Sequence, residues 1–222
     1  MFRTALSLLL ILGPVPVSWA ASLPPACPGP TPVALPADPP GPPAESGVRT
    51  LLETARTVRD VPSGRKIGEA ALSRAKAELS ALLSARPKEA TLHALAGERD
   101  LLLVQYRGFP AGMSYGKKAK AQNDRALALD PDNAEAHLSK GIELFYKPWF
   151  VGGSVPKALS EFERANRLRP DDPRILSWIG VALHRLGRPG ARRAMTRVLV
   201  LCPASPLYEA RAKTFDPRAA HR

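Results

Sequence analysis

Four stretches of the chain repeat one pattern of small, apolar and proline positions. In each stretch a proline follows an alanine by twelve residues, and the pairs are Ala75 and Pro87, Ala119 and Pro131, Ala158 and Pro170, and Ala191 and Pro203. The positions four and seven residues after each alanine lie on one face of a helix, and they are apolar in every stretch except the one with Asn123. The pattern therefore predicts four helices, each with one buried face and each ended by its proline.

A partner helix is expected before each of these four. Three partner segments contain one glycine each, and they are Glu89 to Val104 with Gly97, Ala134 to Tyr146 with Gly141, and Arg174 to Leu186 with Gly180. A glycine inside a helix costs about 0.8–1.0 kcal/mol relative to alanine, so we expect these glycines where a neighbouring helix approaches closely. The leading helix of the first pair, at about Gly47 to Asp60, would cap the N-terminal end. An apolar content of 45% with only 6% aromatic residues fits the resulting all-α fold.

Two segments resemble the second helix of the tetratricopeptide repeat (TPR) family. One runs from Lys157 to Pro170, and the other from Asn123 to Ala136, which includes the link Asp130-Pro131-Asp132-Asn133 into the next repeat. The resemblance covers residues 45–203. It implies a right-handed α-solenoid of about four antiparallel helix pairs that works by binding another macromolecule. A fold does not fix a binding site, so the family alone does not identify the partner.

Two insertions distinguish the middle repeats from the family pattern. The four prolines lie 44, 39 and 33 residues apart, where the family repeats every 34 residues. The extra residues, 107–116 and 147–156, share an order of aromatic, glycine, serine and Lys-Ala. They look like the aromatic-Gly-Gly loops of some exported bacterial repeat proteins, including periplasmic partners of solute transporters. Trp149 and Phe150 either plug the turn of their own repeat, which we favour because aromatic residues fill small cores, or form an exposed anchor for a partner.

The first twenty residues have the pattern of a secretory signal peptide. Arg3 precedes an apolar run from Leu6 to Leu12, and small residues stand at Ser18 and Ala20. Cleavage after residue 20, or alternatively after residue 21, would leave a chain without a transmembrane segment, in the periplasm or secreted. Residues 21–44 hold ten of the 24 prolines up to Pro43 and are expected to form an extended tether. Export permits a disulfide between the two cysteines, Cys27 and Cys202, but two distant cysteines do not establish one.

The sequence contains no recognisable set of catalytic residues. It has no phosphate-binding loop, no His-Glu-x-x-His motif and no paired-cysteine spacing, so we expect no enzymatic activity, cofactor or metal. His93 and His137 occupy matching repeat positions and are expected to pack inside. The net charge of +12 falls to +11 without Arg3. From residue 185 onward there are nine basic residues and only two acidic ones, Glu209 and Asp216. This basic end, including a tail at 204–222 that can hold a short capping helix, either docks an acidic partner or is a solvated cap. Export argues against nucleic acid.

The candidate binding residues lie on the first helices of the pairs and in the Trp149 insertion. They are Glu135, Tyr146, Trp149, Phe150, Arg174, His184 and Arg185. The sequence favours a non-enzymatic scaffold that binds an unidentified protein partner through this surface. The alternative is a periplasmic accessory of a solute transporter, which would hold a small ligand in a closed apolar pore beside Trp149.

Overall fold

The computed structural model describes residues 27, 34–36, 43–213 and 215. The predicted signal peptide, most of the tether and the end of the tail lie outside these residues. The helices are α1 (Glu45–Val58), α2 (Arg65–Ala85), α3 (Ala90–Arg107), α4 (Gly112–Leu129), α5 (Ala134–Tyr146), α6 (Val155–Leu168), α7 (Pro173–Arg185), α8 (Ala191–Leu201) and α9 (Pro206–Lys213), with short 3₁₀ turns η1 (Pro62–Gly64) and η2 (Trp149–Val151).

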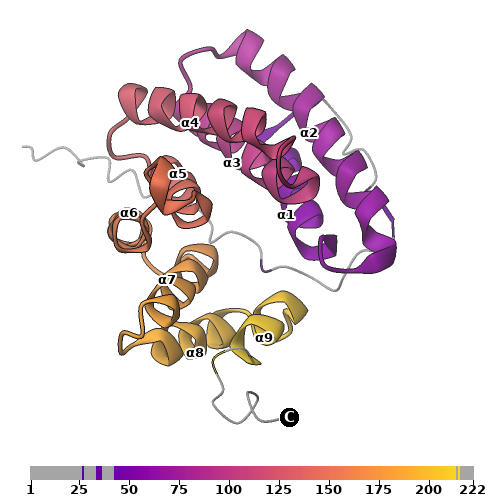
Figure 1. Ribbon diagram of the computed structural model, residues 1–222. Helices are drawn as coiled ribbons and strands as arrows, with labels where there is room; N and C mark the ends of the chain where they lie inside the picture. Colours follow the sequence, from indigo (N-terminus) through magenta and orange to yellow (C-terminus); the bar gives the residue numbers. More distant parts are fainter. Residues whose placement is uncertain (1–26, 28–33, 37–42, 214, 216–222) are drawn as a thin grey trace, which may run out of the picture.

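Consecutive helices pack as antiparallel pairs, α1 with α2, α3 with α4, α5 with α6 and α7 with α8. The pairs stack in chain order, and α9 follows the last pair (Figure 1). The described residues contain no strand. The predicted all-α solenoid of four helix pairs is confirmed. Each second helix ends two residues before its proline, as the twelve-residue spacing indicated.

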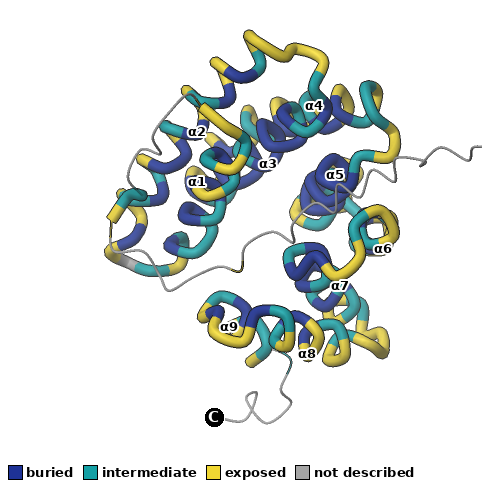
Figure 2. The backbone as a smooth tube through the Cα atoms, turned by 180° about the vertical axis from the view of Figure 1, so that it is seen from behind, coloured by how far each residue is buried: buried dark blue, intermediate teal, exposed yellow. Residues whose placement is uncertain are grey.

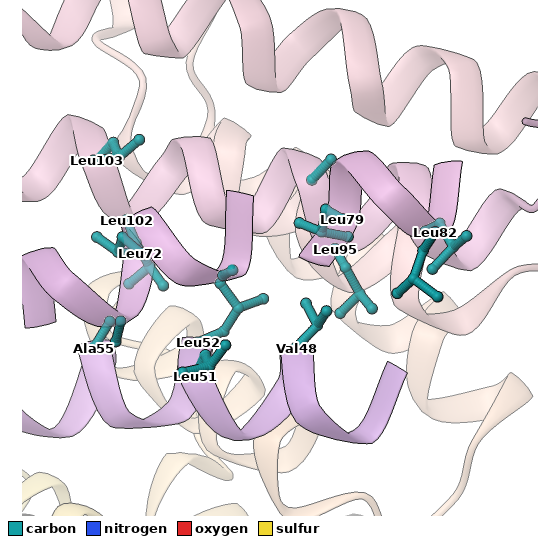
Figure 3. Packing of buried hydrophobic residues seen from close by; sticks show 14 of the residues in the cluster. Val48, Leu51, Leu52, Ala55, Leu72, Leu79, Leu82, Leu95, Leu102 and Leu103 are labelled. Carbon is teal, nitrogen blue, oxygen red and sulfur yellow. The ribbon is translucent and has the colours of Figure 1, made fainter. Parts of the chain in front are cut away.

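The core follows the helical spacing of the apolar residues. In the first pair, Val48, Leu51, Leu52 and Ala55 of α1 are at most 1% exposed, and they pack on leucines of α2 and α3 (Figure 3). The buried stripe of each helix faces the neighbouring helices, while the exposed residues lie mainly on the second helix of each pair and in the turns (Figure 2). Burial of these stripes is what holds short helices in place, because isolated helices of this length are marginal in water.

The three helix glycines lie where another helix approaches, as predicted. A Cβ on Gly141 would lie 2.4 Å from the ring of Phe162 in α6, and a Cβ on Gly97 would lie 2.2 Å from the amide oxygen of Asn123 in α4. Gly180 lies against α8 less tightly, since a Cβ there would lie 3.3 Å from the carbonyl oxygen of Ala191 and 3.4 Å from the sulfur of Met195. Asn123 is fully buried and donates a hydrogen bond to Glu143, which explains the single polar residue in the apolar register.

His93 and His137 have one structural role in successive repeats. A ring nitrogen of each lies at hydrogen-bond distance from the carbonyl oxygen of the preceding proline, 3.0 Å for Pro87 and 2.8 Å for Pro131. The other ring nitrogen contacts Gln122 or Glu161 of the second helix. Both histidines therefore fix the turn between repeats. Within the described ranges, no group of three metal-binding side chains gathers around them or elsewhere.

The solenoid curls until its last helix returns to its first. One small cavity is lined by Arg56 of α1 together with Leu207, Tyr208 and Arg211 of α9. Cys27 forms a disulfide with Cys202, just after α8, with the Cα atoms 5.5 Å apart. Further along the N-terminal segment, Leu35 packs on the core of the first pair and Pro36 accepts a hydrogen bond from Arg74 of α2 at 2.7 Å. The segment is thus attached to both ends of the solenoid.

Candidate partner-binding site

The inner face of the solenoid, formed by α1, α3, α5 and α7, is filled by its own charged side chains. Glu135 of α5 is 1% exposed and is paired with three arginines, Arg49, Arg169 and Arg174. Burial alone would raise the pKa of Glu135, but the guanidiniums, Arg174 foremost, outweigh burial and hold the pKa well below its usual range. Glu135 is therefore ionised, and it joins the first, third and fourth helix pairs electrostatically.

A second buried pair lies closer to α9. Glu98 of α3 pairs with Arg56 of α1, and burial raises the pKa of Glu98 because this guanidinium offsets only part of the loss of water. Arg211 of α9 stacks 5.0 Å from the ring centroid of Trp178 and donates a hydrogen bond to Ser177 at 2.5 Å. The last helix thereby closes the inner face.

This closure changes the position of two candidate residues. The sequence placed Glu135 and Arg174 on an open concave surface, whereas the structure places both inside, with the side chain of Arg174 12% exposed. The cause is the curl of the solenoid, which brings α1 and α9 over α5 and α7. These two residues are brought together as an ion pair, but a partner cannot reach them in this conformation.

The turn between α5 and α6 carries exposed aromatic side chains. Trp149 is 84% exposed and Phe150 is 70% exposed, and their rings contact each other edge to face at 5.9 Å. The favoured interpretation of these residues as a plug is therefore wrong. Backbone hydrogen bonds close the turn without them, from Gly153 to Pro148 and from Ser154 to Leu144, each at 3.0 Å. A Cβ on Gly153 would lie 1.7 Å from the carbonyl oxygen of Lys147, so only glycine permits this tight path.

The preceding repeat has an equivalent exposed turn. Phe109, between α3 and α4, is 86% exposed, and Met113 is also exposed. Phe109 was not among the sequence candidates. The likeness of the two insertions was the signal that could have found it, because Phe109 stands in the first insertion where the aromatic residues stand in the second.

An open recess of about 460 Å³ lies between the turns of the first three pairs. It is lined by Arg59, Asp60, Arg65, Gln105, Tyr106 and Tyr146. Tyr146 is the last residue of α5 and stands three residues before Trp149, while Tyr106 stands three residues before Phe109. Both exposed turns therefore begin at the wall of the recess.

The wall of the recess is held by internal bonds. Arg59 makes two hydrogen bonds to Asp60, and these lower the pKa of the Asp60 carboxyl. Arg65 donates to the carbonyl oxygen of Tyr106 at 2.6 Å, and the Tyr106 hydroxyl donates to Ala55 at 2.6 Å. Burial raises the pKa of Tyr106 to about 12. Tyr146 is 43% exposed and contacts Trp178 edge to face at 5.8 Å. The recess is thus preformed.

The remaining candidates lie elsewhere or have a different setting. His184 and Arg185, at the end of α7, are exposed, and His184 contacts Phe215 at 4.7 Å. The recess near Trp149 is open and lined mainly by charged and polar residues, unlike the closed apolar pore expected for a solute-transport accessory. Each described helix is too short or too polar to cross a bilayer.

The fold and these contacts define a helical-repeat solenoid. A thermophilic TPR protein from Thermus thermophilus has a similar structure, with a TM-score of 0.53 and 20% sequence identity over 75% of this chain and 80% of that chain. No family model and no curated protein matches the chain. The likeness at this identity establishes the TPR-like fold.

Proposed function

We propose that this chain is an exported, non-enzymatic scaffold that binds a protein partner at the recess and its two aromatic turns. The observation that supports this proposal is the exposure of Trp149, Phe150 and Phe109 beside a preformed recess. Aromatic side chains dominate the energetics of protein interfaces, whereas monomeric proteins rarely leave several of them in water together. The site comprises Tyr146, Trp149 and Phe150 with Phe109 and the recess, and His184 and Arg185 are outlying members.

Export is part of the proposal and has separate support. The N-terminal residues have the signal-peptide pattern. The Cys27–Cys202 disulfide also fits an oxidising compartment, because cytosolic thiols are usually kept reduced. Expression of the full chain in a bacterium, followed by N-terminal mapping, should give a mature protein that begins at Ala21 or Ser22. Retention of Met1 on soluble cytoplasmic protein would contradict export.

Partner binding is tested with a double variant in the third pair. The mature protein and Trp149→Ser with Phe150→Ser should each be used for affinity capture from a cell-envelope extract, with quantitative mass spectrometry. We expect at least one protein to be captured by the parent and lost from the variant, with the melting curve of the variant unchanged. Equal capture of every protein by both would remove the aromatic turns from the binding surface.

A further inference from the structure

The two aromatic turns stand in segments that lack acidic residues. Between Asp100 and Asp124 the only charged side chains are basic, and the same is true between Glu143 and Glu161. The basic residues of these segments are Arg107, Lys117, Lys118, Lys120, Lys147 and Lys157. Three of these residues pair with nearby carboxylates, Arg107 with Glu69, Lys120 with Asp124 and Lys147 with Glu143. The other three, Lys117, Lys118 and Lys157, are exposed in the same segments as Phe109, Trp149 and Phe150.

The shape of this surface favours a peptide over a membrane as the binding partner. The turns of three successive pairs surround a recess of about 460 Å³, within the range of pockets that enclose small ligands or a few side chains. A peptide can place side chains in this recess, whereas the flat surface of a bilayer would contact only its rim.

We infer that the partner presents an acidic segment with apolar side chains, which enter the recess beside the aromatic turns while its carboxylates meet the exposed lysines of the two segments, Lys117, Lys118 and Lys157. This inference rests on the proposed function and specifies the chemistry of the partner. Asp60, at the recess wall, is already held by Arg59, and Glu69 pairs with Arg65 and Arg107. The positive charge offered to a ligand is therefore that of the exposed lysines of the two segments.

The probe is a phage-displayed library of random 12-residue peptides selected on the mature, oxidised protein. We expect the retained peptides to be enriched in Asp and Glu together with aromatic or aliphatic residues. Binding of the best synthetic peptide should weaken as salt rises from 50 to 300 mM, because exposed charges are screened over about 10 Å at 0.1 M.

Two variants and two matched controls test the surface. Trp149→Ser with Phe150→Ser should weaken the best peptide at least about tenfold, as expected for aromatic hot spots. Lys117→Glu with Lys157→Glu, which reverses one exposed charge in each segment, should weaken it by a similar factor and flatten the salt dependence. The controls are Val200→Ser, an exposed apolar residue on α8, and Arg192→Glu with Arg193→Glu, two exposed arginines on α8. Both controls should leave binding unchanged.

The alternative outcomes separate this inference from the proposed function. Peptides without acidic enrichment that still require Trp149 would overturn the inference and leave the scaffold function standing. Failure to retain any peptide, together with Trp149-dependent binding to vesicles of phosphatidylglycerol and phosphatidylcholine, would overturn both and identify a lipid surface as the partner.

Discussion

Glu135 is the residue on which the charges of the inner face depend. Glu135 is 1% exposed, and its carboxylate pairs with the guanidiniums of Arg49 in α1, Arg174 in α7 and Arg169 in the turn before α7. Removing one member of a buried ionic group leaves the others uncompensated, which is strongly destabilising. We expect Glu135→Gln to lower the free energy of unfolding by about 3 kcal/mol. Urea denaturation followed by circular dichroism measures it, and a loss within experimental error would show that water compensates the arginines.

The same residue contributes to acid sensitivity. Its folded-state pKa lies well below the usual 4.5, so the unfolded chain takes up the proton first as the pH falls. Its contribution to stability is therefore complete above about pH 4.5 and declines as the pH falls below that value. Unfolding curves between pH 3 and 6 should show a shallower loss of stability in Glu135→Gln than in the parent. Parallel curves would mean that other carboxylates govern acid unfolding.

Gly141 and Gly116 make a matched pair of helix glycines with opposite expectations. A Cβ on Gly141 would meet the ring of Phe162, which is fully buried and stacked on Trp178 and so cannot move aside. Gly141→Ala should therefore cost about 1–3 kcal/mol. A Cβ on Gly116 meets only Val104, at 3.9 Å. Gly116→Ala should stabilise α4 by about 0.5–1 kcal/mol. Thermal melts of both variants check the prediction, and the same sign for both would contradict it.

The turn Trp149–Val151 carries side chains that we propose for binding but that contribute little to the stability of the fold. Its aromatic rings are mostly in water and its backbone bonds do not involve them. We expect Trp149→Ser with Phe150→Ser to change the free energy of unfolding by less than about 0.5 kcal/mol, as for most surface substitutions. Trp178→Ala, at a 6% exposed ring in α7, should cost about 3–5 kcal/mol. A large loss in the turn variant would restore the plug interpretation, and differential scanning fluorimetry can measure both.

The elements were predictable because their signals are local. An alanine, an apolar residue one turn later and a terminal proline specify a helix and its buried face within a dozen residues, so Ala158 and Phe162 were assigned correctly. The exposure of Trp149 was not predictable in this way, since an aromatic residue in a turn can face inward or outward. The orientation of this turn is determined by backbone hydrogen bonds, such as the one from Gly153 to Pro148. The spacing of apolar residues in the sequence does not indicate these bonds.

The curl of the whole solenoid determines which residues of the inner face are covered. We predicted from the sequence that Glu135 and Arg174 are surface residues. No local sequence pattern indicates that α1 and α9 cover them. The pairing of Cys27 with Cys202 was left open for the same reason, because 175 residues separate the cysteines. Both features depend on the rotation of each repeat relative to the one before it, and these rotations add up along the whole chain.

The disulfide should couple the two ends of the solenoid in stability. Repeat solenoids without such a link are stabilised mainly by neighbouring repeats, so their terminal helices unfold most readily. Replacing Cys27 by Ser should cost about 2–4 kcal/mol. We also expect hydrogen exchange in α8 and α9 to become faster. Protection of α9 that is the same with and without the disulfide would show that its contacts with α1 and α7 suffice.

The same bond also decides where a pulling force would act. If both termini were drawn apart, the tension would pass from Cys27 directly to Cys202 and bypass every helix from α1 to α8. In an optical trap the oxidised protein should then extend with a contour length shorter by on the order of 600 Å than the reduced protein, at about 3.5 Å for each step of the sequence separation of 175 between the cysteines. With the two ends joined in this way, mechanical load would pass between them while the repeats, and the binding surface that we propose on them, stay folded.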